Sequence, residues 1–192
     1  MSGARKSFAA IALALALLGA WQVAAGGWIH AKGHLAQHLI AHAWAGEREG
    51  RPARRPWPGA DLRPIARMTV RERGVELYVL DQASARALAF GPAIVGGSAA
   101  PGAWGNTVIV AHRDTHFAFL KRLALDDEIA IEGARGAPAR YRVRELAIVD
   151  QADSGVLETS DTSQLTLITC YPFDAVRPGT RLRYVVIADR IG

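Results

Sequence analysis

The sequence predicts a small, mainly β domain, closed as a barrel or folded as a sandwich, preceded by an N-terminal helix. A chain of 192 residues, half of them apolar, has room for one domain with a sizeable core. From about residue 65, short runs rich in Val, Ile, Leu and Tyr alternate with Gly, Pro and Asp clusters, which is typical of strands joined by turns. The predicted strands are 66–70, 75–80, 107–111, 128–131, 141–148, 165–169 and 182–188, and short helices are predicted at 83–89 and 116–123.

The first part of the chain predicts a membrane anchor. Arg5 and Lys6 precede an apolar run over residues 8–25 that is broken only by one glutamine. This run approaches the ~20 residues that a bilayer-spanning helix needs, and tryptophans lie near its end. A cleaved signal peptide is the alternative, because Ala24-Ala25-Gly26 is compatible with a cleavage site. We expect residues 1–28 to form a cytoplasmic tip and an uncleaved transmembrane helix, with the rest of the chain facing outward.

Residues 29–60 are expected to join this anchor to the domain. A helix is predicted over residues 28–44, and residues 47–64 are so rich in Arg, Gly and Pro that they favour an extended linker. We expect Trp57 within the linker to pack on the domain. Four histidines at four-residue spacing form a stripe along the predicted helix, and such pairs can share a zinc ion. No carboxylate or thiol completes a ligand set, so a polar stripe is favoured over a metal site. The histidines are His30, His34, His38 and His42.

Composition narrows the functional class. The net charge of +5 comes from Lys and Arg residues that are spread along the chain rather than interleaved with aromatics in one basic segment. This pattern does not favour a nucleic-acid partner, and it suits a protein that works beside anionic lipid or cell-wall polymer. The chain has a single cysteine, so no internal disulfide can form.

That cysteine, Cys170, ends the apolar run LTLITC, and Pro172 is expected to stop the strand just beyond it. His112 directly follows another apolar strand, NTVIVA, 58 residues upstream. In a small barrel these two strand ends can be neighbours. An imidazole beside a thiol can take its proton to give the reactive thiolate, and can later protonate an amine leaving group. His116 is the rival base, which we rank second because it falls where a helix should begin.

Acyl transfer also needs a group that stabilises a developing oxyanion. The last predicted strand offers Arg181 and Arg183 on one face by two-residue alternation. Arginine stays protonated and cannot act as a base, but it can hold an oxyanion or favour a thiolate. Which arginine lies nearer to Cys170 depends on the register of this strand.

These strings together resemble the sortases, which carry a TLxTC motif, an upstream histidine and a downstream arginine. The matching positions are TLITC ending at Cys170, His112 within AHRDTHF, and Arg183 within LRYVV, and the likeness covers about residues 61–190. The strings HRDTHF, TCYPFDAV and PWPGADLRPIARM most resemble the proteobacterial class GN sortases. One departure is Ala111, where many sortases have glycine before the histidine.

The resemblance implies a closed β-barrel of about eight strands with short helices, spanning residues 61–192. It implies a cysteine transpeptidase that cleaves an LPxTG-like C-terminal sorting signal on a secreted protein through a Cys170 thioester. The protein is then transferred to an amine acceptor such as peptidoglycan. His112 would be the acid and base, and Arg183 would hold the oxyanion. The residues expected to contact substrate are Ala111, His116, Thr169 and Tyr171.

The same resemblance implies an inner-membrane protein whose domain faces the periplasm, and it implies no metal or organic cofactor. We interpret the acidic cluster Asp126-Asp127-Glu128 as a turn into a strand rather than as an ion site. The alternative function is a catalytically silent, membrane-tethered peptide-binding module on the same fold. A metal-handling protein built on the histidine stripe is a third hypothesis, but it leaves the three reactive groups unexplained.

Overall fold

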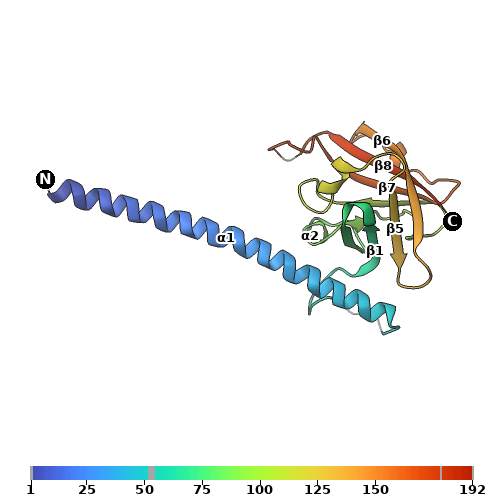
Figure 1. The fold of residues 1–192 in the computed structure, drawn as a ribbon, viewed down its shortest axis with the longest axis horizontal. Helices are drawn as coiled ribbons and strands as arrows, with labels where there is room; N and C mark the ends of the chain where they lie inside the picture. The colour runs from blue at the N-terminus through green and yellow to red at the C-terminus, as the bar shows by residue number, and fades with distance from the viewer. Residues whose placement is uncertain (1, 52–54, 178, 192) are drawn as a thin grey trace. The chain divides into compact units, whose positions relative to one another are not determined.

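Eight strands of the described residues close into a barrel in the order β1-β2-β3-β4-β7-β8-β6-β5 (Figure 1). The computed structural model describes residues 2–51, 55–177 and 179–191, with only the backbone described for 2–12, 14 and 25–34. The strands are β1 (Pro64–Val70), β2 (Val75–Leu80), β3 (Ala93–Ile94), β4 (Asn106–Val110), β5 (Glu128–Gly133), β6 (Ala139–Asp150), β7 (Gln164–Tyr171) and β8 (Leu182–Arg190). The helices are α1 (Ser2–Arg48) and α2 (Ala85–Leu88), with 3-10 turns η1 (Arg71–Arg73), η2 (Ala118–Arg122) and η3 (Gly155–Leu157).

The mainly β, closed-barrel prediction is confirmed, and all seven predicted strands form. The eighth strand, β3, was not among the seven because it has only two residues. It closes the gap between two longer strands, since Ala93 pairs with Leu80 of β2 and with Val110 of β4. The helix predicted over 116–123 is instead the 3-10 helix η2.

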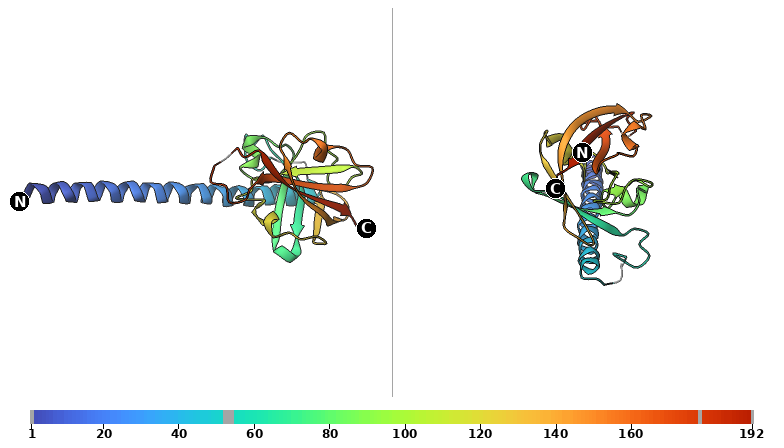
Figure 2. Two further views of the ribbon diagram at one scale, coloured as in Figure 1. Left: turned by 90° about the horizontal axis from the view of Figure 1, so that it is seen from above. Right: turned by 90° about the vertical axis from the view of Figure 1, so that its right-hand side faces the viewer.

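Residue alternation along the strands separates the barrel interior from its outer face. In β7, Leu165 and Leu167 belong to the main core cluster inside the barrel, together with Val186 of β8. Ile168, which directly follows Leu167, belongs to a second cluster on the other face with Val185. Because β7 is buried on both faces, its sequence reads as a continuous apolar run rather than as an alternating one. Figure 2 shows these strands from two further directions.

The helix predicted over residues 28–44 is part of the longer helix α1. Among the residues that the structure describes, no helix is both long and apolar enough to cross a membrane. The membrane anchor predicted for residues 1–28 stays a prediction; residues 2–28 belong to helix α1.

Contacts divide the chain between His38 and Leu39. In the second unit, the last turns of α1 contribute to a cluster in which Ile40 and Leu80 are fully buried. Trp57 also packs on this cluster, with its ring edge-on to Phe90 at 5.1 Å between centroids, so the packing predicted for this tryptophan is confirmed. The linker between α1 and β1 contains residues 52–54, which lie outside the described residues.

The histidine stripe is only half described. The side chains of His38 and His42 are exposed, and those of His30 and His34 lie outside the described residues. Within the described part of the chain, no group of three or more His, Cys, Asp or Glu side chains is placed to hold a metal ion.

Candidate active site

The parallel pairing of β4 with β7 brings the predicted histidine and cysteine to one end of the barrel. Their register has a constant offset of 58 residues, from Asn106 opposite Gln164 to Val110 opposite Ile168. Beyond the strand, the Ala111 N–H still donates to the Ile168 carbonyl at 3.3 Å. Continued for two residues, the same offset places His112 beside Cys170. Two residues that are distant in sequence thus lie at the same edge of the sheet, because neighbouring parallel strands end there.

On the other side of β7, Cys170 lies directly opposite Arg183 of β8. Directly paired residues in an antiparallel ladder project from the same face, with their Cβ atoms about 5 Å apart. Arg181 precedes β8, and its guanidinium makes an ion pair with Asp150 at 3.2 Å. The register therefore pairs Arg183, and not Arg181, with the cysteine.

Alternation along β7 places Cys170 on the outer face that carries Ile168, and the thiol is half-exposed. Thr169 is on the opposite, interior face, where its hydroxyl donates to the Ala111 carbonyl at 2.7 Å. The Ala111 methyl group also packs in the barrel core. Two of the residues expected to contact substrate are therefore buried, and they join the end of β7 to the chain just before the histidine.

The Arg183 guanidinium is held in place by three hydrogen bonds. Its Nη1 donates to the Thr180 carbonyl at 2.6 Å and to the Leu182 carbonyl at 2.9 Å. Its Nη2 donates to Gln151 Oε1 at 2.9 Å. A guanidinium has five N–H donors, so among the described residues Nε and one Nη2 hydrogen are left to contact a ligand. Among the described residues no carboxylate forms an ion pair with Arg183, although Asp150 lies close enough to interact with its charge.

His116 lies close enough to His112 for the two imidazoles to interact electrostatically. Burial lowers the pKa of His116, the neighbouring His112 lowers it further, and Asp114 acts in the opposite direction. His116 is thus half-buried and favoured in its neutral form, whereas His112 is exposed at the end of β4. The ranking of His112 ahead of His116 as the base stays a prediction.

Tyr171 belongs to a cluster of three aromatic rings directly after the cysteine. Its ring stacks on Tyr184 with 6.2 Å between centroids, and Phe173 meets both rings edge-on at 5.2 and 6.1 Å. Burial raises the pKa of Tyr184, and the neighbouring Tyr171 raises it further. The cluster gives the segment after Cys170 an apolar support. As predicted, β7 ends just before Pro172.

Three residues at the site were not predicted from the sequence: Gln151, Thr180 and Arg113. Arg113 donates hydrogen bonds from the His112 segment to the connection between β7 and β8. The one feature of the sequence that could have indicated a role for Arg113 at the site is its position directly after His112 in HRDTHF. Gln151 and Thr180 lie in connections with no motif, and only the folded register brings them to Arg183.

The acidic cluster forms the predicted turn. Asp126 has a φ of 68°, and Glu128 begins β5. Burial alone would raise the pKa of Asp127, but the Ala124 N–H and the Arg73 guanidinium outweigh it, so the pKa is lowered. Both groups hydrogen-bond to the Asp127 carboxylate, at 2.9 and 2.6 Å. Asp127 thus has a structural role in the turn.

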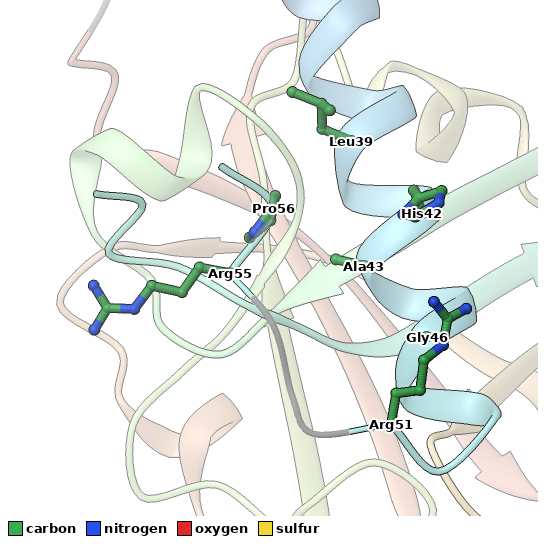
Figure 3. A pocket seen from close by; sticks show the side chains of 7 residues that line it. All are labelled: Leu39, His42, Ala43, Gly46, Arg51, Arg55 and Pro56. Carbon is green, nitrogen blue, oxygen red and sulfur yellow. The ribbon is translucent and has the colours of Figure 1, made fainter. Parts of the chain in front are cut away.

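A pocket of about 200 Å³ lies elsewhere, beside the last turns of α1 (Figure 3). The Arg51 side chain runs back along the helix toward His42, whereas Arg55 points away from it. None of the predicted catalytic residues lines this pocket. Its lining residues are Leu39, His42, Ala43, Gly46, Arg51, Arg55 and Pro56.

The fold and the site place this chain among closed, eight-stranded β-barrels that carry a thiol at a strand end, with an arginine opposite it on the neighbouring strand. Residues 68–191 match the family described as the sortase domain, which is well over half of the chain. The chain therefore belongs to the sortase family, whose members are typically cysteine transpeptidases that act on sorting signals.

Solved sortase structures support this assignment at the level of the fold. A sortase D5 transpeptidase from Clostridium perfringens is 22% identical with a TM-score of 0.63, covering 82% of this chain and 96% of that one. Sortase A from Corynebacterium diphtheriae is 28% identical with a TM-score of 0.62, over 70% of this chain and 63% of that one. Sortase C-1 from Actinomyces oris is 23% identical with a TM-score of 0.60, over 67% and 75%. No curated protein sequence matches significantly.

Proposed function

We propose that the chain is an active sortase that cleaves an LPxTG-like sorting signal and transfers the protein to an amine. The observation that carries this proposal is the position of Cys170 between two neighbours. The end of β4, continued to His112, lies on one side, and Arg183 of β8 lies directly opposite on the other. Acyl transfer needs a nucleophile, a group that carries protons and a fixed positive charge, and the three neighbouring strands supply one of each.

In the first half of the reaction, the Cys170 thiolate attacks the carbonyl carbon between Thr and Gly of the sorting signal. The carbonyl oxygen becomes an oxyanion, which Arg183 stabilises with the N–H groups that its other hydrogen bonds leave free. The C–N bond then breaks, and the imidazolium of His112 gives its proton to the leaving amine. The products are a thioester on Cys170 and a released C-terminal peptide.

In the second half, the acceptor amine attacks the thioester carbonyl carbon. Neutral His112 takes the proton from the amine, and Arg183 again holds the oxyanion. The C–S bond breaks, Cys170 leaves as a thiolate, and a new amide joins the protein to its acceptor. No metal or organic cofactor takes part in either half, because the thiolate supplies the nucleophile and the guanidinium supplies the positive charge.

The decisive experiment incubates the full chain in detergent with LPxTG-type peptides and hydroxylamine. Wild-type protein should form the peptide hydroxamate and a thioester adduct, both detected by mass spectrometry. Cys170→Ala should form neither. A matched control is Ser160→Ala, which also alters a small polar side chain but lies in the exposed connection between β6 and β7.

The competing proposal is a silent peptide-binding module. It predicts that wild type and Cys170→Ala bind the peptides equally and that neither forms product. It also predicts that Cys170 resists alkylation in the folded protein. A peptide library with varied motif positions separates this outcome from a poor choice of one peptide.

Finer assignments rest on sequence alone. The proposed place in class GN is supported by the strings HRDTHF and TCYPFDAV, and the proposed acceptor is an amine such as that of peptidoglycan.

The proposed location is the inner membrane, with the barrel in the periplasm. It is supported by Arg5 and Lys6 before the apolar run, and by the exposed large apolar side chains between Leu13 and Val23 of α1. Cell fractionation with alkaline extraction tests this location, and recovery in the soluble fraction would contradict it.

A further inference from the structure

The Arg113 side chain, which lies outside the connection between β7 and β8, restrains this connection by hydrogen bonds. Arg113 Nη2 donates to the Ala175 carbonyl at 2.7 Å and to the Arg177 carbonyl at 3.2 Å. Its Nη1 donates to the Thr180 hydroxyl at 3.2 Å. One guanidinium thus contacts three residues that span most of the connection.

Phe173 packs on the core at the start of the connection, and the Gln151 N–H donates to the Arg181 carbonyl at 2.7 Å at its end, but its middle has little else to fix its shape. Within its described residues, the backbone bond from Ala175 N–H to the Pro172 carbonyl is weak at 3.3 Å, and Val176 is 98% exposed. Gly179 has a φ of 78°, in the region that glycine adopts at low cost. A segment with few apolar contacts and few backbone bonds opens easily unless side chains restrain it.

Thr180 links this restraint to the proposed oxyanion group. Its hydroxyl accepts from Arg113, while its carbonyl accepts from Arg183 Nη1 at 2.6 Å. The residue after His112 is therefore joined through Thr180 to the arginine opposite Cys170. Moving the Thr180 backbone would move the shortest of the three hydrogen bonds that orient the Arg183 guanidinium.

We infer that Arg113 is a positioning residue, which fixes the β7–β8 connection and thereby orients Arg183 over the reacting carbonyl. Arg113 does not itself contact the reacting atoms. The inference rests on the proposed function, since it assigns a task to a group of that same site. A lysine could not replace Arg113, because one ammonium cannot reach three acceptors that a planar guanidinium spans.

A double-mutant cycle in the full chain tests the inference. The variants are Arg113→Ala, Arg183→Ala and the double variant, and kcat/KM is measured for hydroxylaminolysis of the sorting peptide. Arg113→Ala alone should lower kcat/KM by about 10- to 100-fold, mostly through kcat, since displacement of a catalytic group by about 1 Å can cost about 100-fold. In the Arg183→Ala background the same change should cost no more than about 3-fold.

Equal losses in both backgrounds would overturn the inference, because a general effect on folding does not depend on Arg183. Two further variants sharpen the result. Arg113→Lys should resemble Arg113→Ala, and wild-type activity in Arg113→Lys would show that charge alone matters. Arg122→Ala removes an exposed arginine of η2 and should react like wild type.

A second readout keeps the inference separate from the proposed function. Alkylation of Cys170 by iodoacetamide can be measured at several pH values without any peptide substrate. Its pH dependence reports how strongly a nearby cation favours the thiolate. Arg113→Ala should shift this profile in the wild-type background but not in the Arg183→Ala background. If no peptide is processed but this pattern holds, the proposed function fails and the positioning role stands. If the profile is the same with and without Arg113, the positioning role fails.

Discussion

At the scale of single residues, the reactivity of Cys170 depends on its neighbours on the two sides of β7, toward β4 and toward β8. Arg183 carries a fixed charge opposite the thiol, and its carbonyl and amide partners orient it without neutralising it. Asp150 forms its ion pair with Arg181, and it interacts with Arg183 only at longer range. The two arginines of the string RLRY, Arg181 and Arg183, therefore have different tasks, one structural and one proposed as catalytic.

His116 gives a pH prediction. Its folded pKa lies below the ordinary value of about 6.5, first because of burial and then because of His112, so the unfolded chain binds protons more readily than the folded one. The stability that depends on neutral His116 is present above pH 6.5 and is lost as the pH falls below it. Thermal unfolding of wild type should therefore shift to lower temperature between pH 7.5 and 5, and His116→Gln should show a smaller shift.

The control for this measurement is His42→Gln, which removes an exposed histidine of the same barrel unit. It should keep the wild-type dependence on pH. An identical pH dependence in wild type and His116→Gln would show that the burial of this imidazole does not affect stability.

At the scale of elements, the start of β4 holds the connection between β6 and β7. Asn106 Nδ2 donates to the Val156 and Glu158 carbonyls at 3.2 and 3.1 Å, and Asn106 Oδ1 accepts from the Thr166 hydroxyl at 2.7 Å. Asn106 is only 3% exposed, so its removal takes these donors from the two carbonyls and the acceptor from the Thr166 hydroxyl, which keeps only the bond that it accepts from Gln164. Asn106→Ala should lower the free energy of unfolding by about 2–3 kcal/mol, measured by denaturant titration.

Two companion variants identify the cause of this loss. Asn106→Asp keeps the acceptor for Thr166 but loses both donated bonds, so it should also be destabilised. Thr162→Ala changes an exposed side chain of the same connection and should stay within about 0.5 kcal/mol of wild type. A wild-type unfolding curve for Asn106→Ala would mean that water replaces the amide at no cost.

The elements also show which features the sequence could predict. Long strands such as β7 were predictable because buried β-branched and apolar runs leave a clear pattern. The two-residue strand β3 carries no such pattern, since its pairing depends on the positions of β2 and β4. The placement of His112 and Cys170 at one edge of the sheet was predictable, because each of the two strands is followed by or ends in a reactive residue. The hydrogen bonds of Arg113 were not predictable, because their acceptors are carbonyl groups whose directions exist only after folding.

At the scale of the whole molecule, the barrel unit extends back into the end of α1. Contacts place the unit boundary at Leu39, and the side chains of Ile40 and Trp44 are 0% and 4% exposed. Arg48 also pairs with Glu132 of β5. A chain beginning at residue 39 should unfold like the full chain, whereas one beginning at residue 49 should lose roughly 3–6 kcal/mol from the two buried side chains. Denaturant unfolding of both truncated chains measures this difference in the free energy of unfolding. Equal values would show that the end of α1 does not stabilise the barrel.

The parallel ladder of β4 and β7 has a consequence for how the protein acquires activity. Parallel neighbours cannot be joined by a tight hairpin, and here β5 and β6 are formed by the chain between them. The loop that this ladder closes is long, so its entropy must be overcome before the ladder contributes any stabilisation. The hairpin of β5 and β6 can form early, but it contains none of the three proposed catalytic residues. A nascent or partly refolded chain would therefore have a thiol without its imidazole neighbour, and catalytic competence would arrive only with closure of the barrel.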